Sequence, residues 1–236
     1  MTFSFSYSRW SCWDECPAKY KYKHIDKLPE PKSKAMEKGI EVHRQVAEYI
    51  EGKTDERPAS LRLFTGMADA LRDEAKHDLC KVEMQVAFDK DRKRVEWFSR
   101  NAYWRFIWDV LYINRRKDSL ASVDAVDWKT GQPRGSYDAQ MQIFAIPAYW
   151  MFDNLASFKG HLVYLDTGDV VTVEYDRAQF YGPSCDPAAN DGLYGLWMAN
   201  VAMMESDRAF RAKPSREACR FCHFHKAKGG PCEQGY

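Results

Sequence analysis

Hydrophobic residues recur with helical spacing through the first third of the chain. One stripe of apolar positions, three or four residues apart, is Leu61, Phe64, Ala68, Leu71 and Ala75. This is the periodicity of an amphipathic helix. A polar, proline-containing break at Glu30–Ser33 separates two earlier helical patterns. The sequence therefore predicts three helices, over Ser8–Tyr22, Ala35–Glu51 and Ala59–Leu79.

The pattern changes from helical spacing to alternation near residue 80. Lys81–Asp89 alternates apolar and polar residues, and the runs around Asp109 and Asp127 are rich in β-branched and aromatic residues. Both patterns favour β-strands. A turn with glycine at Asp166–Asp169 predicts a hairpin between two later strands. The predicted strands are Lys81–Asp89, Arg105–Ile113, Ser122–Asp127, His161–Leu165 and Val170–Tyr175.

Two further helices complete the predicted fold. Tyr137–Phe152 is apolar and is expected to cross back over the sheet, with a kink at Pro147. Asn190–Arg208 then leads into a cysteine-rich tail. We therefore expect one mixed α/β domain. Residues 1–80 form its helical N-terminal part, residues 81–176 its core sheet and helix, and residues 177–236 its last helix and tail.

Composition indicates a globular protein. With 236 residues, 45% of them hydrophobic, the chain can bury a large core. It has no run of about 18 apolar residues that could span a bilayer, and Met1–Cys12 does not resemble a signal peptide. We therefore expect a cytoplasmic protein with no membrane contact. Because the net charge is only +1, a nucleic acid would have to bind a local basic patch.

Two aspartates lie in strands that are predicted to be neighbours. Asp109 lies within the first and Asp127 ends the second, and the polar link Asn114–Ser119 between them resembles a hairpin loop. Both carboxylates are therefore expected to face one cleft. Lys129 follows Asp127 by two residues, which places it on the same strand face. This arrangement predicts a divalent-cation site suited to phosphodiester hydrolysis.

Seven cysteines without an export signal point to metal or cluster ligation rather than to disulfides. They are distributed as Cys12 and Cys16 near the start, Cys80 and Cys185 alone, and Cys219, Cys222 and Cys232 near the end. The two isolated cysteines are interpreted as small buried hydrophobes. The three in the tail would suit a local zinc site, with His223 or His225 as the fourth ligand.

Four polar motifs follow one another in the order Gly39–His43, Asp109, Asp127–Gly131 and Gln140–Ala145. Their order and spacing resemble those of RecB-like nucleases of the PD-(D/E)xK superfamily. In that family a histidine helix precedes an acidic strand, a carboxylate-x-Lys strand and a helix with Gln-x-x-x-Tyr. Phe144 replaces the tyrosine here. The opening segment, from Ser8 to Tyr20, is similar to the first helix of the family, so the resemblance covers nearly the whole chain.

The resemblance implies a restriction-endonuclease-like fold and a metal-dependent deoxyribonuclease. Asp109 and Asp127 would bind one or two Mg²⁺ or Mn²⁺ ions, with the Trp128 carbonyl and the His43 imidazole completing the shell. Lys129 would orient or help deprotonate the attacking water and offset charge in the transition state. The alternative for Lys129 is a simple ion pair with Asp127.

Two more residues receive supporting roles from the same resemblance. Glu83 lies on the preceding strand, where the family often has an acidic residue, and would bind the metal through water or hold Lys129. It would otherwise be an exposed strand glutamate. Gln140 would hydrogen-bond a phosphate or the attacking water, the alternative being a helix-cap or surface amide.

Several branches of this family carry an iron–sulfur cluster held by one cysteine before the nuclease core and three after it. The resemblance therefore implies a 4Fe-4S cluster on Cys16, Cys219, Cys222 and Cys232, with Cys12 as the alternative remote ligand. Such a cluster requires the first helix to fold against the tail. The Cys222–Cys232 spacing is longer than is usual in the family, and the local zinc site remains the alternative.

The expected substrate is DNA with ends or single strands, cut by an exonuclease that resembles phage and CRISPR-adaptation enzymes. A helicase or recombination protein is the expected partner. Bases and aromatics interleave in Lys19–His24, a pattern that suits single-strand contacts or, alternatively, a solvated helix face. The alternative function is a non-catalytic nucleic-acid-binding module on the same fold.

Overall fold

The computed structural model describes residues 3–116, 119–133 and 138–235. Within these ranges a mixed sheet of six strands has the order β2-β1-β3-β4-β5-β6. The strands are β1 (Cys80–Phe88), β2 (Arg94–Val95), β3 (Trp104–Arg116), β4 (Ser119–Lys129), β5 (Ser157–Tyr164) and β6 (Val170–Asp176). Neighbouring strands are antiparallel except for β4 and β5, which are parallel. The predicted mixed α/β fold is confirmed.

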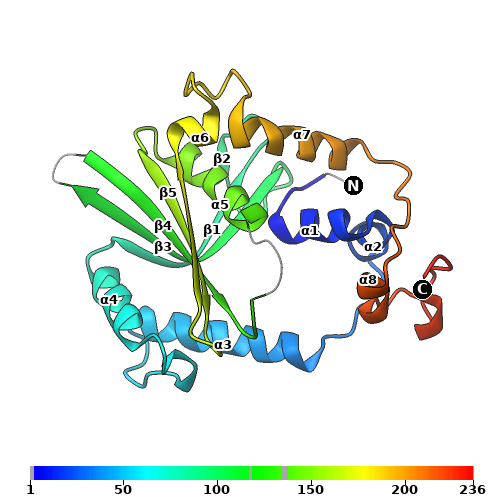
Figure 1. Ribbon diagram of the computed structural model, residues 1–236, viewed down its shortest axis with the longest axis horizontal. Helices are drawn as coiled ribbons and strands as arrows, with labels where there is room; N and C mark the ends of the chain where they lie inside the picture. Colours follow the sequence, from blue (N-terminus) through cyan, green and yellow to red (C-terminus); the bar gives the residue numbers. More distant parts are fainter. Residues whose placement is uncertain (1–2, 117–118, 134–137, 236) are drawn as a thin grey trace.

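Helices cover both faces of this sheet, as Figure 1 shows. They are α1 (Tyr7–Glu15), α2 (Pro17–Tyr20), the π-helix η1 (Lys21–Ile25), α3 (Lys34–Ile50), the 3₁₀ turn η2 (Ala59–Leu61), α4 (Thr65–Lys76), α5 (Asp138–Met151), α6 (Arg177–Tyr181), α7 (Gly192–Ser206), α8 (Arg216–Phe221) and the 3₁₀ turn η3 (Lys226–Lys228). Adjacent residues of β3 contribute to different cores: Val110 packs with α3 and α4, and Leu111 packs with α5 and α7. Strand alternation thus produces a three-layered molecule.

Helix α5 makes the predicted crossover between the parallel strands β4 and β5. It lies so close to β5 that a Cβ atom at Gly160 would come within 2.4 Å of the Met141 sulfur. Glycine at this position therefore sets how closely the helix packs on the sheet. The helix continues through Pro147, and its predicted first residue, Tyr137, lies outside the described residues.

Two predicted helices are wrong in part. The segment predicted as one helix over Ser8–Tyr22 breaks at Cys16, whose backbone is extended. Proline disfavours the helical conformation in the residue before it, and Pro17 follows Cys16. The segment predicted as Ala59–Leu79 is instead a 3₁₀ turn followed by α4, and Asp78 adopts a positive φ of 61° before β1 begins. Asp tolerates this conformation better than most residues.

The strand predictions were too short around the two aspartates. Strands β3 and β4 extend into the predicted loop 114–119 and pair there, with a register shift between Asn114 and Arg115. Polar composition alone therefore does not end a strand when a neighbouring strand continues to offer backbone partners. The short elements β2, α6 and α8 were not predicted.

The two ends of the chain pack against each other, and α2 lies beside α8 in Figure 1. The Lys213 ammonium donates to the Asp14 carbonyl at 2.9 Å, and the rings of Tyr22 and Phe224 lie 5.7 Å apart. The first helical segment thus contacts the C-terminal tail. Among the described residues, the helices are all too short or too polar to cross a membrane.

Candidate active site

The carboxylates lie where β3 and β4 separate. Their backbone pairing ends at Val110 and Val126, and Asp109 and Asp127 occupy the next position on each strand. The Trp128 amide is bound by the Asp109 carboxylate, with 2.9 Å between the nitrogen and Oδ2. A side chain thus replaces a backbone acceptor, and the site opens without leaving this amide unpaired. The sequence predicted a role for the Trp128 carbonyl, not for its amide.

Glu83 extends the row of carboxylates onto β1. The pairs Val82–Val110 and Met84–Trp108 flank it, so Glu83 lies opposite Asp109. Its φ is 46°, which is rare for a residue other than glycine and costs conformational energy. At this φ the Glu83 backbone departs locally from the strand conformation. The apolar and polar alternation of the sequence gave no indication of this departure.

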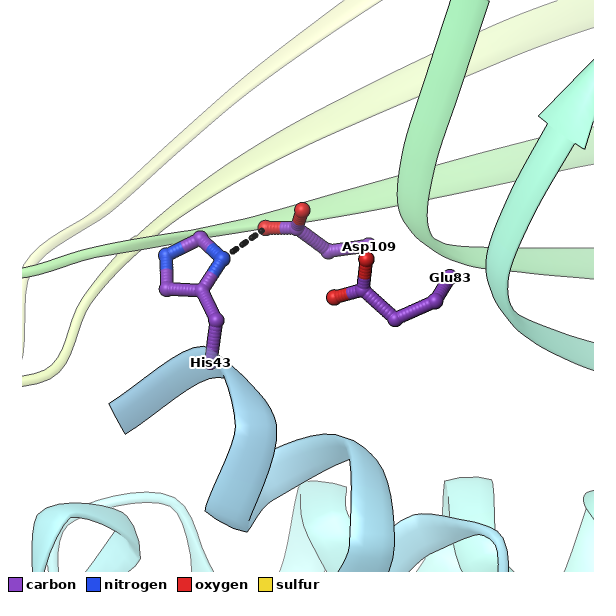
Figure 2. Close-up of side chains that lie close together, drawn as sticks. All are labelled: His43, Glu83 and Asp109. Atoms are coloured by element: carbon purple, nitrogen blue, oxygen red, sulfur yellow. Dashed lines mark ion pairs between the residues drawn. The ribbon is translucent and has the colours of Figure 1, made fainter. Parts of the chain in front are cut away.

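Helix α3 completes a group of three candidate ligands. His43 Nδ1 lies 3.3 Å from Asp109 Oδ2. One ligand atom from each of His43, Glu83 and Asp109 lies within 4.8 Å of the others, and Figure 2 shows the three side chains converging. One imidazole and two carboxylates suit Mn²⁺ or Mg²⁺. These residues therefore form a possible metal site.

Asp127, Lys129 and Gln140 form a second polar group beside the first. The Lys129 ammonium lies 2.6 Å from Asp127 Oδ2 and donates to Gln140 Oε1 at 2.9 Å. Gln140 Nε2 donates to Asp127 Oδ1 at 2.6 Å. Asp127 Oδ2 is fully buried, and the Lys129 ammonium is its charged partner. Gln140 is buried at 5% exposure and is not a surface amide.

The electrostatics of both groups favour a bound cation. Burial, followed by the charge of Asp109, raises the pKa of Asp127, and the same two causes raise the pKa of Glu83. Burial lowers the pKa of His43, but the hydrogen bond and charge of Asp109 outweigh it and raise that pKa to about 9. Carboxylates that repel one another are relieved when a divalent cation binds between them.

Four cysteines line one small cavity between the first helical segment and the tail. They are Cys16, Cys219, Cys222 and Cys232. All seven cysteines of the chain are free. Cys12, the alternative remote ligand, packs in the hydrophobic core, where burial raises its pKa to about 11. The structure therefore places Cys16, and not Cys12, with the three tail cysteines.

The geometry disfavours the local zinc site. Tetrahedral zinc with bonds of about 2.3 Å requires sulfurs roughly 3.8 Å apart. Among the described residues, only the His43, Glu83 and Asp109 group brings three candidate ligand atoms within 4.8 Å, so the cysteines are spread more widely. His225 Nδ1 already accepts from the Ala227 amide at 3.2 Å, and its Nε2 packs against Gly235. His223 does not line the cavity.

The basic segment Lys19–His24 contributes little free charge. Its three lysines form ion pairs, Lys19 with Glu15, Lys21 with Asp26 and Lys23 with Glu30, at 2.5 to 2.6 Å. Tyr20 is buried. These contacts favour the interpretation of a solvated helix face over that of a nucleic-acid patch.

Comparison with known proteins identifies a family for this chain. A family model of the PD-(D/E)XK nuclease superfamily matches residues 4–227. A solved structure described as "Crystal structure of SSO0001" is 13% identical, with 91% of this chain and 93% of that chain covered and a TM-score of 0.32. The search of curated proteins gave no match. The family match covers most of the sequence and confirms the predicted resemblance at the level of the superfamily. The chain belongs to the PD-(D/E)XK nuclease superfamily.

Proposed function

We propose that the protein is a divalent-metal-dependent deoxyribonuclease of the RecB-like type that trims DNA ends or single strands in recombination, repair or phage DNA processing. The observation that carries this proposal is the side-by-side placement of two groups. His43, Glu83 and Asp109 offer ligand atoms within 4.8 Å of one another, and the Lys129 ammonium lies 2.6 Å from Asp127. Cation ligands and a positioned ammonium are what metal-assisted phosphodiester hydrolysis requires.

Each side chain has a distinct task in this proposal. When bound, Mg²⁺ or Mn²⁺ supplies Lewis-acid stabilisation of the negative charge that develops on the phosphate. His43, Glu83, Asp109 and Asp127 would be its ligands, and the Trp128 amide donates to the Asp109 carboxylate and holds it in place. Lys129 offsets charge and orients the attacking water. Gln140 bonds both Lys129 and Asp127, and so fixes the direction of the ammonium.

We propose also that Cys16, Cys219, Cys222 and Cys232 hold a 4Fe-4S cluster. The four thiols line one cavity and are more widely spread than a zinc site requires. Burial raises the pKa of Cys222, and the charge of Lys19, which lines the same cavity, acts against that shift. The cluster would join the first helical segment to the tail.

The test is cleavage of end-labelled oligodeoxynucleotides of each polarity with Mn²⁺, Mg²⁺ or EDTA. We expect a ladder of products with either metal and none with EDTA. The Asp109→Asn protein, purified in the same way, controls for contaminating nucleases. If wild-type protein binds DNA but cuts none of the substrates with either metal, the non-catalytic binding module replaces this proposal.

A further inference from the structure

Two hollows flank the carboxylates, and Glu83 lines both. The first, here called the α3 hollow, is about 630 Å³ and is lined by His43, Arg44, Glu48, Glu51 and Lys53 of α3 and its following turn. The second, here called the β3 hollow, is about 460 Å³ and is lined by Ser4, Arg9, Trp97, Arg105, Asp109 and Asp127 among others. DNA could therefore approach the metal site from either side.

The α3 hollow has no unpaired cation among its described lining residues. Arg44 donates to both Glu41 and Glu48 at 2.6 to 2.9 Å. Lys53 is paired with Glu51 at 2.5 Å. The third base, His43, is paired with Asp109 at 3.3 Å. Each cation that lines the α3 hollow is therefore already neutralised by an acid, and the hollow offers a phosphate backbone no free positive charge.

The β3 hollow differs in its cations: Glu83, Asp109 and Asp127 line it too, but its two arginines are not paired with them. Arg105 donates to the Ser4 hydroxyl at 2.6 Å, to the Trp97 carbonyl at 3.0 Å and to the Ser99 carbonyl at 3.4 Å. Arg9 donates to the Ser4 carbonyl at 3.2 Å. Among the described residues neither guanidinium has a carboxylate within 4.0 Å. Both half-buried guanidiniums thus donate to Ser4, and neither forms an ion pair within the described residues.

Two acids that share another hollow with Arg9 are engaged elsewhere. Glu205 and Asp207 line a neighbouring hollow with Arg9, but Glu205 accepts from Tyr103 and Lys90, and Asp207 accepts from Trp13. Burial, followed by repulsion from Arg9, lowers the pKa of Arg105. Like charges held together in this way are stabilised by an anion that bridges them.

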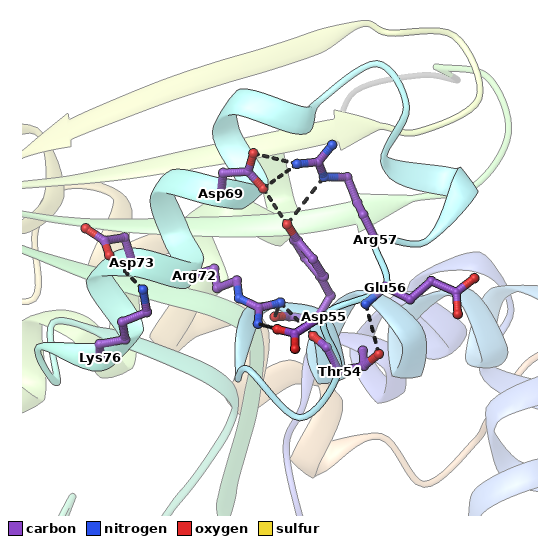
Figure 3. A network of polar contacts seen from close by, with 9 residues as sticks. Thr54, Asp55, Glu56, Arg57, Asp69, Arg72, Asp73 and Lys76 are labelled. Atoms are coloured by element: carbon purple, nitrogen blue, oxygen red, sulfur yellow. Dashed lines mark hydrogen bonds and ion pairs between the residues drawn. The ribbon is translucent and has the colours of Figure 1, made fainter.

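Arginines elsewhere on the helical part of the chain show the contrast. Arg57 and Arg72 are ion-paired with Asp69 and Asp55, in the network of Figure 3. The charges of these two arginines are neutralised by the aspartates. Arg9 and Arg105 form no such ion pair, and both guanidiniums lie in a hollow that Asp109 and Asp127 also line.

The β3 hollow also carries aromatic surface. Trp97 lines it, and the next residue, Phe98, is 91% exposed. Exposed aromatic faces stack on unpaired bases, whereas paired bases are stacked within the duplex. The unpaired arginines and the aromatic surface of the β3 hollow therefore suit single-stranded DNA better than a duplex.

On the premise of the nuclease proposed above, we infer that the β3 hollow binds single-stranded DNA on one side of the cleaved bond. Arg9 and Arg105 contact its phosphates, and Trp97 stacks on a base. The strand does not continue across the α3 hollow, whose cations are all ion-paired, so the cut falls near an end of the strand. A site with unpaired cations on one flank only thus favours exonucleolytic trimming.

The test is fluorescence anisotropy of a short labelled oligodeoxynucleotide in EDTA, at several salt concentrations, with wild type, Arg9→Gln, Arg105→Gln and, as the matched control, Arg44→Gln. Either hollow variant should weaken binding roughly tenfold and reduce the slope of log K against log salt by about 0.7. Arg44→Gln should leave both unchanged. Arg105→Lys should keep the salt slope, because it keeps the positive charge while it changes the contacts that the guanidinium makes with Ser4. Thermal melts check that each variant is folded.

Wild-type affinity and slope in folded Arg9→Gln and Arg105→Gln would overturn the inference, as would a larger loss in Arg44→Gln. Equal affinity for a blunt duplex would overturn its single-strand part. Cleavage by wild type separates the two proposals. If wild type cuts DNA while both hollow variants bind normally, only this inference fails. If binding depends on the two arginines but no metal supports cutting, the hollow stands and the proposed catalysis fails.

Discussion

The carboxylate site and the cysteine cavity are assembled in different ways. Asp109, Asp127 and Glu83 come from three adjacent strands, and the strand register brings them together. Cys16 and Cys219 are 203 positions apart in the chain by their numbering (219 − 16), and they meet only because α2 packs against the tail. The first site depends on the central sheet, and the second depends on the docking of the two ends of the chain.

We therefore expect substitutions at the carboxylate site to affect mainly catalysis, and substitutions at the cysteine cavity to affect mainly stability. The sheet around Asp109 and Asp127 rests on two hydrophobic cores, so removing one carboxylate leaves most of the packing intact. The residues that line the cysteine cavity belong to neither core, and the ends of the chain meet there in contacts such as Tyr22 with Phe224. A bound metal centre would therefore supply much of the free energy that holds the two ends together.

The largest expected effect is on catalysis at the sheet. Lys129→Ala should reduce cleavage at least 10²-fold to 10³-fold, because a positioned charge that acts in the transition state contributes about 3 to 4 kcal/mol. The melting temperature should change little, since Lys129 is only partly buried. The measurement is single-turnover cleavage of labelled oligonucleotide. Lys159→Ala removes a lysine paired with Glu174 on the same sheet and serves as the control. Wild-type rates in Lys129→Ala would make Lys129 a simple ion-pair partner.

The next effect concerns the cysteine cavity. Cys16→Ser should lower the melting temperature by about 10 °C, because losing one cluster ligand weakens the contact between the chain ends by several kcal/mol. Iron content and absorbance near 400 nm, measured after anaerobic purification, should fall with it. Cys185→Ser is the control, because Cys185 lies outside the cavity. Unchanged iron and stability in Cys16→Ser, or a colourless wild type containing one zinc, would contradict the cluster.

The sequence revealed those parts of the fold that depend on local pattern. Helix α3 and strand β1 fall where periodicity placed them, because each buries one face on a neighbouring layer. The break at Cys16 was missed although Pro17 signals it, because the helical apolar pattern continues on both sides. The extension of β3 and β4 into a charged segment depends on pairing between strands, which no single-strand pattern records.

The candidate site was predicted as a set of residues but not as a geometry. Motif order named His43, Asp109, Asp127 and Lys129. It could not show that Glu83 takes a positive φ, or that β3 and β4 separate beyond Val110. Arg9 and Arg105 were missed entirely, because they are 96 positions apart by their numbering and meet only through Ser4.

His43 offers a way to sharpen the assignment of metal ligands. Its pKa is about 9 without metal, so its ring carries a proton at neutral pH that must leave before it binds a cation. The affinity of wild type for Mn²⁺ should therefore rise with pH up to about 9. His43→Ala should lose roughly tenfold or more in Mn²⁺ affinity, lose less for Mg²⁺, and lose the pH dependence due to this group.

Titration calorimetry in two buffers of different protonation enthalpy measures the protons released. Wild type should release more protons than His43→Ala when Mn²⁺ binds at neutral pH. Equal proton release, or equal loss of affinity for both metals, would assign His43 a positioning role for Asp109 instead of a place among the ligands.

The smallest expected effect is at Gln140, which bonds two other members of its polar group and is not among the proposed metal ligands. Its amide bonds Lys129 at 2.9 Å and Asp127 at 2.6 Å. Gln140→Ala should remove the hydrogen bond that orients the Lys129 ammonium. We expect kcat to fall about fivefold, which corresponds to one hydrogen bond of about 1 kcal/mol, and KM to change little. Gln142→Ala on the same helix, which removes a bond to Trp197 on α7, is the matched control. A rise in KM with unchanged kcat would mean that Gln140 binds the DNA directly and does not act through Lys129.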